Sequence, residues 1–466
     1  MSAEAGEQPR RARPLTGGAV MGAASRVSVA ATGALTTIFV ARVLGADGAG
    51  AFAIALTIIY VLTVFSTLGL EHGIAYYVSS RRWAATAAFR TALLVALAAG
   101  VVVAALGVLA RVLVPSAFGG LSLPLCAVAA AAMPFALRWF YGSFVALSDD
   151  RYEAFVLPPA IQSAAALVLV VGLGAPLGIG GAVVGLALSH VLAAAATVAL
   201  ARRAGLSRVG DGTPTRTHLR RSLSFGIKGY LTNALQVLNY RVDLFVLSTV
   251  VPAATLGHYS VAIAVTTVMW LLPQALSDVL FPRIAALSAS AGADADAEAH
   301  RAFVEAKSLR HTAIIVALGT VVLALALLFL VVPVYGGAFR EAIGLGLIRL
   351  PGVALIGIAG IMSATILGRG HPIYGLYTTL VVTPATMAMY VTLIPWLKGP
   401  GAALASTLSF TLSFLLTLIF YRRATGRSAL PLLLPTRSEL DDYRLLAPRI
   451  LAWARGLRAR RGGGTT

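Results

Sequence analysis

The amino-acid sequence predicts an all-α polytopic membrane protein with about twelve transmembrane helices. Of its 466 residues, 58% are hydrophobic and only 12% are charged, about half the charged fraction of an ordinary soluble domain. Apolar runs of about twenty residues, the length that crosses a bilayer as a helix, recur from one end of the chain to the other. The basic residues cluster between these runs, as topology signals do.

The apolar runs form two sets of six, separated by a basic segment. They lie at roughly 17–41, 48–70, 90–114, 121–147, 155–176, 178–200, 223–250, 254–277, 311–335, 343–368, 374–397 and 400–421. The predicted domains are a disordered cytoplasmic N-terminus (1–16), a six-span N-lobe (17–201), a cytoplasmic linker (202–222), a six-span C-lobe (223–421) and a basic cytoplasmic tail (422–466). In the tail, Leu446, Ile450, Trp453 and Leu457 share one helical face, which predicts either an amphipathic helix on the anionic leaflet or a partly ordered topogenic tail.

Lysine and arginine set the predicted orientation. With the N-terminus inside, the inner segments hold about seven times as many basic residues as the outer ones, which hold only Arg42, Arg111, Arg340 and Lys398. The positive-inside rule therefore predicts a protein of the plasma membrane with both termini in the cytoplasm. The net charge of +19 lies in these loops and tails, so we predict membrane lipids rather than nucleic acid as its partner.

Short motifs recur between the two sets of spans and indicate an internal repeat. Gly50 and Gly257 open similar segments at an offset of 207, and Gly181 and Gly401 do so at an offset of 220. The polar turn 148–151 parallels 368–371, again at 220. Two six-span halves of this kind predict two pseudo-symmetric lobes that hold a substrate between them, an architecture of transporters.

Residues 225–252 are apolar enough to span the membrane but contain several polar side chains. At about 100° per residue, five of them fall within about 80° of one another and form a polar stripe: Lys228, Thr232, Gln236, Asn239 and Asp243. Arg241 lies on the opposite face. Because charge at membrane depth is costly, such residues usually face a bundle interior or a watery cavity. We predict that Lys228, Gln236, Asn239 and Arg241 line a substrate cavity, although snorkelling competes for Lys228 and structural pairing competes for Arg241.

Other ionisable residues within the spans are interpreted in the same way. Arg26 shares a face with small residues and is predicted to line the cavity, with a structural ion pair as the alternative. Arg138 is predicted to contact a substrate head group or to snorkel. Asp243 is predicted to form a structural ion pair, and Arg349, only about six residues from an outer helix end, to snorkel. A proton-linked pair of Glu71 and His72 is a further, less favoured interpretation.

The sequence contains no motif of an enzyme. HExxH, GxxxxGK[ST], GxSxG and clustered His/Cys sets are absent, and the single cysteine, Cys126, lies within an apolar run. We therefore predict no catalytic residue, no metal site and no cofactor. The excess of arginine and lysine over acid within the spans favours an anionic substrate over a drug-like cation.

Several segments resemble the Wzx-type polysaccharide flippases of the multidrug/oligosaccharidyl-lipid/polysaccharide exporter superfamily. The resemblance covers residues 17–421 and rests on short segments, which are Ala41–Gly45, Gly48–Ala53, Leu68–Leu70, Phe225–Tyr230, Asn239–Asp243, Leu256–Ser260, Phe281–Arg283, Leu350–Gly352, Gly368–Pro372 and Gly399–Ala403.

The resemblance implies a MATE-like exporter fold that moves a polyprenyl-diphosphate-linked glycan from the cytoplasmic to the outer leaflet by alternating access. It also implies that Arg26, and less closely Arg241, receive the diphosphate. Glycosyltransferases or a polymerase of the same pathway are further predicted partners. The alternatives are a multidrug antiporter of the same superfamily and a non-transporting membrane scaffold for glycosyltransferases. The major facilitator fold is disfavoured because Ser79–Trp83 does not supply its loop motif.

Overall fold

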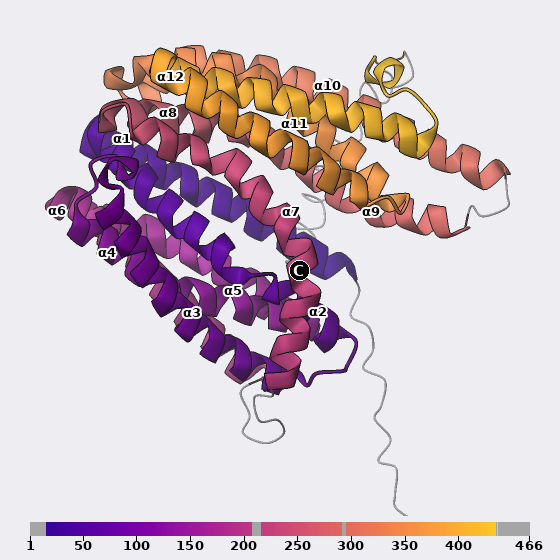
Figure 1. Cartoon of the computed structure of the whole chain (residues 1–466), viewed down its shortest axis with the longest axis horizontal. Coiled ribbons are helices and arrows are strands. Elements are labelled where there is room, and N and C mark those ends of the chain that lie inside the picture. The colour runs from indigo at the N-terminus through magenta and orange to yellow at the C-terminus, as the bar shows by residue number, and fades with distance from the viewer. Residues whose placement is uncertain (1–14, 207–215, 291–294, 435, 437–466) are drawn as a thin grey trace, which may run out of the picture. The chain divides into compact units, whose positions relative to one another are not determined.

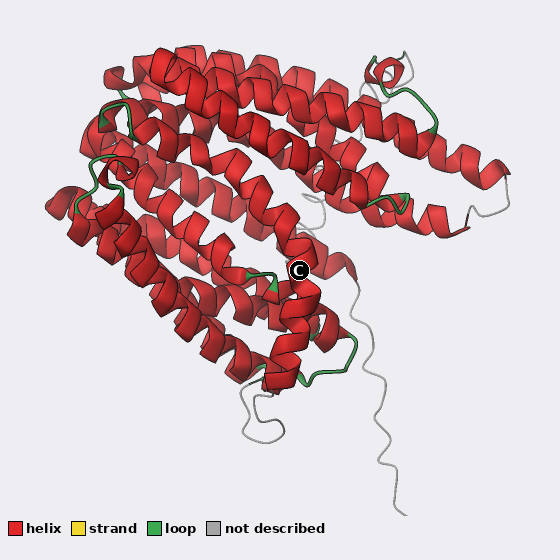
Figure 2. Cartoon of the chain, viewed as in Figure 1, coloured by secondary structure: helices red, strands yellow, loops and turns green. Residues whose placement is uncertain are grey.

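The computed structural model describes residues 15–206, 216–290, 295–434 and 436, and its regular elements are helices joined by short loops (Figures 1 and 2). They are α1 Leu15–Thr67, α2 Leu70–Ser79, α3 Ala85–Leu113, η1 Pro115–Phe118, α4 Leu123–Ala131, α5 Met133–Ser148, α6 Tyr152–Arg203, α7 Arg216–Ser248, α8 Ala253–Thr267, η2 Val268–Trp270, α9 Leu271–Ser290, α10 Ala295–Tyr335, η3 Gly337–Phe339, α11 Arg340–Gly368, α12 Ile373–Thr425 and η4 Leu430–Leu433. The predicted tail helix at 446–457, the N-terminal segment 1–14 and the linker segment 207–215 lie outside the described residues.

Within the described ranges, eight helical segments are long and apolar enough to cross a membrane. Three of these lie in α1, α6 and α12, and each contains one residue with non-helical backbone angles, at Gly45, Gly178 and Lys398 respectively. A straight helix of 52 residues, the length of α6, would measure about 78 Å, more than twice the hydrocarbon thickness of a bilayer. Each of the three therefore supplies two spans. With the more polar α7, these segments account for the predicted twelve.

The chain divides into two compact units. Unit 1 comprises Met1–Val261 and Val332–Glu341, and unit 2 comprises Ala262–Val331 and Ala342–Thr466. This division follows spatial contacts and falls within α8, whereas the predicted lobes follow the sequence repeat. The predicted lobe boundaries at 202–222 stay a prediction.

Unit 1 is a bundle built around α5 and α6. Helix α6 packs on α1, α4 and α5, while α3 runs alongside α4 and α5 (Figure 1). Helix α7 packs on α1 and α2. The segment 332–341 joins this unit at its edge, where Arg42 Nε donates to Val334 O at 2.7 Å and His258 Nδ1 lies 2.9 Å from Glu341 Oε2.

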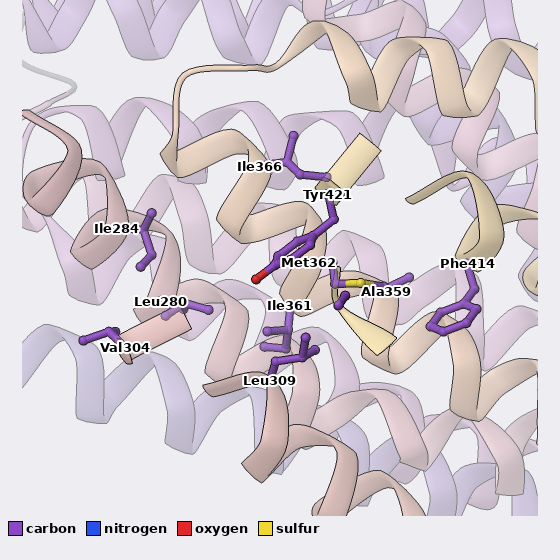
Figure 3. Close-up of a cluster of buried hydrophobic side chains, with 11 residues drawn as sticks. Leu280, Ile284, Val304, Leu309, Ala359, Ile361, Met362, Ile366, Phe414 and Tyr421 are labelled. Atoms are coloured by element: carbon purple, nitrogen blue, oxygen red, sulfur yellow. The ribbon is translucent and has the colours of Figure 1, made fainter. Parts of the chain in front are cut away.

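Unit 2 has its own apolar core between α9, α10, α11 and α12. Figure 3 shows side chains from these helices that lie side by side and are buried. Among them, Ile284, Leu309 and Met362 are fully shielded, and Tyr421 contributes its ring to the cluster. Burying apolar surface against neighbouring helices fixes how these four helices pack.

The two halves of the chain repeat the same backbone geometry. The bend at Gly178 (φ 63°, ψ −146°) recurs at Lys398 (φ 54°, ψ −126°), its counterpart at the offset of 220. Beyond each bend a glycine approaches the preceding helical segment so closely that a Cβ atom on Gly181 would collide with Leu173 O, and one on Gly401 with Leu393 O. These two contacts are related by the same offset. The prediction of two pseudo-symmetric halves is confirmed by these matching bends and glycine contacts.

A reciprocal glycine contact expresses the repeat at the shorter offset, 207. A Cβ on Gly50 of α1 would collide with Ala253 O of α8, and one on Gly257 of α8 would collide with Ala46 O of α1. At this offset the two glycines are counterparts of each other, and so are the two alanines. Two equivalent helix starts therefore pack backbone to backbone, which requires glycine because any side chain would hold them apart.

Candidate functional site

Helix α7 carries most of the predicted cavity residues, and its polar stripe enters different surroundings along its length. Gln236 is exposed and its Nε2 donates to Tyr240 Oη at 3.3 Å. One turn further, Asn239 is buried, and so is Asp243. The side chains of Lys228 and Thr232 lie outside the description. The stripe therefore passes from an exposed position into the packed interior of unit 1.

Asp243 is held by a tyrosine. Tyr259 Oη of α8 donates to Asp243 Oδ2 at 2.7 Å, and the Leu244 backbone N–H donates to Oδ1 at 2.8 Å. Hydrogen bonds to a carboxylate are strong, so these two fix the position of the Asp243 side chain. The hydrogen-bonded structural role is observed, while the predicted ion pair stays a prediction.

Arg241 lies on the other face of α7, as predicted, and is half-buried. Its guanidinium carbon is 5.2 Å from the centre of the Tyr60 ring of α1. Such a cation–π contact attracts a cation by about 0.5–2 kcal/mol, depending on its exposure. The contact positions the guanidinium and does not consume its N–H donors, so they stay available for another partner.

Arg26 is exposed on α1, although residues close to it in sequence pack on α6. Ser25 Oγ donates to Val156 O at 3.0 Å, and Thr32 Oγ1 contacts Ser163 Oγ. On the face that Arg26 shares with Gly22 and Gly33, a Cβ added to either glycine would meet nothing within 4 Å. Among the described residues, therefore, no other helix comes within 4 Å of these two glycine positions.

Arg138 is half-buried on α5, and its Nε is buried without a hydrogen-bond partner among the described residues. Its neighbour Trp139 donates from Nε1 to His190 Nδ1 of α6 at 3.1 Å, which joins the two helices. Arg26, Arg138 and the α7 residues all belong to unit 1. Their convergence on one ligand stays a prediction.

The prediction that Arg349 snorkels is wrong. Its side chain is 1% exposed in unit 2, where Nη1 donates to Thr266 Oγ1 at 3.0 Å and the guanidinium lies over the Phe410 ring at 5.5 Å. The sequence showed how far Arg349 lies from the end of its helix. It did not show which side chains of other helices surround it. Here α8 and α12 enclose it.

Two buried carboxylates were undervalued by sequence reasoning. Glu305 of α10 forms a two-pronged ion pair with Arg369, with both N···O distances at 2.7 Å. Glu71, at the start of α2, is buried among groups of α1, α5 and α7. A single acidic residue in the sequence signals little by itself, because its burial depends on helices that are distant in the sequence.

Solved membrane transporters have the same fold. The lipid II flippase MurJ in an inward closed conformation matches with a TM-score of 0.72 and 13% identity, over 89% of this chain and 91% of that chain. An inward-facing MATE family multidrug transporter of the MOP superfamily matches with a TM-score of 0.68 and 16% identity, over 87% and 98%. A Pyrococcus furiosus MOP superfamily transporter, described as having a binding pocket of reverse polarity, matches with a TM-score of 0.58 and 15% identity, over 89% and 95%.

These matches show that the chain has the fold of MOP superfamily membrane transporters. A family model for polysaccharide biosynthesis proteins matches residues 39–344. The chain belongs to this family of polysaccharide biosynthesis proteins. No curated protein matches the sequence significantly.

Proposed function

We propose that this transporter flips an anionic lipid-linked oligosaccharide, a polyprenyl-diphosphate-linked glycan, from the cytoplasmic to the outer leaflet of the plasma membrane. It works by alternating access, performs no enzymatic reaction, and has both termini in the cytoplasm. Support comes from the family of polysaccharide biosynthesis proteins and from a fold similar to that of a lipid II flippase. Glycosyltransferases or a polymerase that make the glycan are its proposed partners.

The observation that carries the proposal is the exposed side chain of Arg26 on a spanning helix, on a face where no described residue comes within 4 Å of a Cβ added to Gly22 or Gly33. A cation at membrane depth costs about 2.5–3.5 kcal/mol on insertion scales, so it indicates a function. A guanidinium offers paired N–H donors that match phosphate oxygens, and no other side chain does this as well. Arg138 adds a second guanidinium in the same unit, whose buried Nε has no hydrogen-bond partner in the part of the chain that the structure describes.

A multidrug antiporter of the same superfamily is the competing function, because MATE structures match the fold over nearly their full length. The sign of the charges in the proposed cavity distinguishes the flippase function from the multidrug antiporter function. An arginine-lined cavity repels a cationic drug and attracts a diphosphate. A scaffold that only recruits glycosyltransferases would gain nothing from an exposed arginine within a span.

The test replaces Arg26 in cells that depend on the gene. Arg26→Ala should lower the surface glycan and raise the lipid-linked intermediate, because losing a charge-assisted contact of about 1.5–3 kcal/mol costs roughly tenfold or more in affinity. Arg26→Lys should restore part of the activity, since it keeps the charge but not the paired donors. Arg422→Ala, which removes an exposed arginine at the end of α12, is the matched control. Normal glycan and intermediate levels in Arg26→Ala at unchanged protein level would refute the proposal.

Orientation has its own test. A cysteine at the α12 bend, Lys398→Cys in a chain whose buried Cys126 is replaced by Ala, should react with an impermeant thiol reagent from outside intact cells. Reaction only after permeabilisation would invert the topology.

A further inference from the structure

Glu71 is a buried carboxyl at the junction of α1 and α2, and one of its oxygens has no partner among the described residues. The residue is 2% exposed. Its Oε1 accepts a hydrogen bond from Thr67 Oγ1 at 3.3 Å, while Oε2 is buried without a hydrogen-bond partner in the described part of the chain. The only ion-pair contact described for Glu71 is with His72, whose Nε2 lies 3.7 Å from Oε1 and whose side chain is about half exposed. An ionised carboxylate with this little compensation costs several kcal/mol to bury.

Tyrosines from two other helices surround this carboxyl, but their donors are already used. Tyr141 Oη of α5 donates to Ser66 O at 3.3 Å and to Thr67 O at 3.2 Å. Tyr230 Oη of α7 donates to Phe65 O at 3.0 Å. The two hydroxyls therefore satisfy the last carbonyls of α1, which have no partner within their own helix. They do not stabilise a charge on Glu71.

The titratable groups that act on Glu71 are His72 on its own helix, Tyr141 on α5 and Tyr230 on α7. The packed helices also carry the cations Arg90 on α3, Arg138 on α5 and Lys228 on α7, while α1 contributes the neutral Thr67. Burial raises the pKa of the Glu71 carboxyl above its ordinary value, although hydrogen bonds from the backbone and Thr67 and the charge of His72 oppose the rise. Geometry and burial both favour the protonated form.

The same junction is where α7 docks on α2 with the two backbones in contact. A Cβ on Gly69, which has φ +76°, would collide with Gly226 O, and one on Gly73 would collide with Ser222 O. Glu71 lies between these two glycines in the sequence. Backbones packed this closely leave no room for water between α2 and α7. If Glu71 ionises and water enters to solvate its charge, the two helices must therefore move apart.

We infer that Glu71 is a proton-binding site whose charge controls the docking of α7 on α2. With a proton on the carboxyl, the junction is neutral and α7 stays docked. When the proton leaves to bulk water beside the half-exposed His72, the uncompensated carboxylate loosens the seam. Because α7 also carries Gln236, Asn239 and Arg241, proton release would move the proposed cavity residues; this last link rests on the proposed function.

The sign of the pH dependence follows from the raised pKa. The folded state holds the proton to a higher pH than the unfolded state does, so stability falls as pH rises from the ordinary carboxyl pKa through the folded-state pKa, and stays low above it. Glu71→Gln keeps the shape but cannot ionise. In detergent solution from about pH 5 to pH 9, the Tm of wild type should fall below that of Glu71→Gln by a few degrees as pH rises, and the two should converge at the acid end.

Glu305→Gln is the matched control. Glu305 is as buried as Glu71 but forms a two-pronged ion pair with Arg369. Its replacement should lower the Tm across the whole pH range, because the guanidinium of Arg369 loses its two-pronged partner and keeps only the longer contact with Glu298, at 3.3 Å. The two variants should therefore move stability in opposite directions at alkaline pH.

A second variant gives a readout that a purely structural role would not produce. Removing the positive charge of His72 should shift the midpoint of the Tm profile to higher pH in His72→Ala, because that charge favours the ionised carboxylate.

Hydrogen exchange tests the link to the docking of α7. At one alkaline pH, the 222–232 region of α7 should exchange more slowly in Glu71→Gln than in wild type.

The inference is overturned if Glu71→Gln lowers the Tm at every pH, as Glu305→Gln does, or if its profile is as steep as that of wild type. Unchanged exchange in α7 would overturn the link to docking. These measurements need no substrate, so normal glycan levels in Arg26→Ala would defeat the proposed flippase function without touching this result, and the reverse also holds.

Discussion

The polar turns 148–151 and 368–371 have the same backbone and opposite charges. In the first, Arg151 N donates to Ala146 O at 2.8 Å, and in the second His371 N donates to Ile366 O at 3.2 Å, an equivalent bond at the longer repeat offset. At the equivalent central position the first turn has Asp149 and the second has Arg369. The two halves therefore share the backbone conformation of this turn but form different ion pairs there.

The difference in charge comes with a difference in how exposed the ion-pair partners are. Asp149 pairs with Arg81 and Arg151, whose side chains are 75% and 29% exposed. Arg369 is nearly buried and pairs with Glu305, which is 2% exposed. Exposed pairs are screened by water and contribute little, whereas breaking a buried pair leaves an uncompensated charge. Four sets of substitutions test this comparison and the repeat behind it.

The largest effect is expected at the buried pair. Arg369→Ala should lower the free energy of unfolding by about 3–5 kcal/mol, because the Glu305 carboxylate loses its partner inside the protein. Asp149→Ala at the equivalent position should cost about 1 kcal/mol or less. Denaturant titration of the purified variants measures both losses. Equal losses would contradict the contrast between a pair with exposed partners and a buried pair.

The paired glycines after the two bends come next. Gly181→Ala and Gly401→Ala should each cost about 1–3 kcal/mol, since the added methyl collides with a backbone carbonyl that cannot yield like a flexible side chain. Gly375→Ala, where a Cβ would meet nothing within 4 Å, should be neutral or slightly stabilising in its helix. Thermal unfolding decides, and a loss at only one of the paired positions would show that the halves pack differently there.

At the bends themselves the two halves differ in sequence but not in conformation. Lys398 holds backbone angles that glycine adopts readily and other residues do not, while its counterpart is Gly178. Lys398→Gly should therefore raise the free energy of unfolding by about 1 kcal/mol. Gly178→Ala is the reciprocal variant and should lower it. A destabilised Lys398→Gly would mean that the lysine side chain makes a contact worth more than the strain.

The smallest effect is expected at the positive-φ residue of each polar turn. Asp150 has φ +60° where the second half has Gly370 at +84°. Asp150→Gly should stabilise by only a few tenths of a kcal/mol, because aspartate tolerates the left-handed region better than most residues. Gly370→Asp should be mildly destabilising by a similar amount. Tm differences of about a degree are the expected readout.

Much of the fold could be predicted because the bilayer imposes a length. A run of about twenty apolar residues has few alternatives to a spanning helix, and the glycine motifs at offsets of 207 and 220 marked the repeat before its geometry was seen. The candidate site was less accessible. The helical periodicity of α7 correctly separated Arg241 from Asp243, but it did not indicate that Asn239 and Asp243 are buried while Gln236 is exposed.

Hydropathy, charge asymmetry and the spacing of repeated motifs were sufficient, from the sequence alone, to determine a membrane protein of about twelve spans in two similar halves. These properties are local or periodic, so they can be read along the chain. Tertiary structure alone decided that Arg349 is enclosed, that Arg369 forms an ion pair with Glu305, and that Glu71 is buried at the junction where α7 packs on α2. Burial and partner choice depend on side chains brought together from distant helices, and that physical information lies in packing rather than in any one segment.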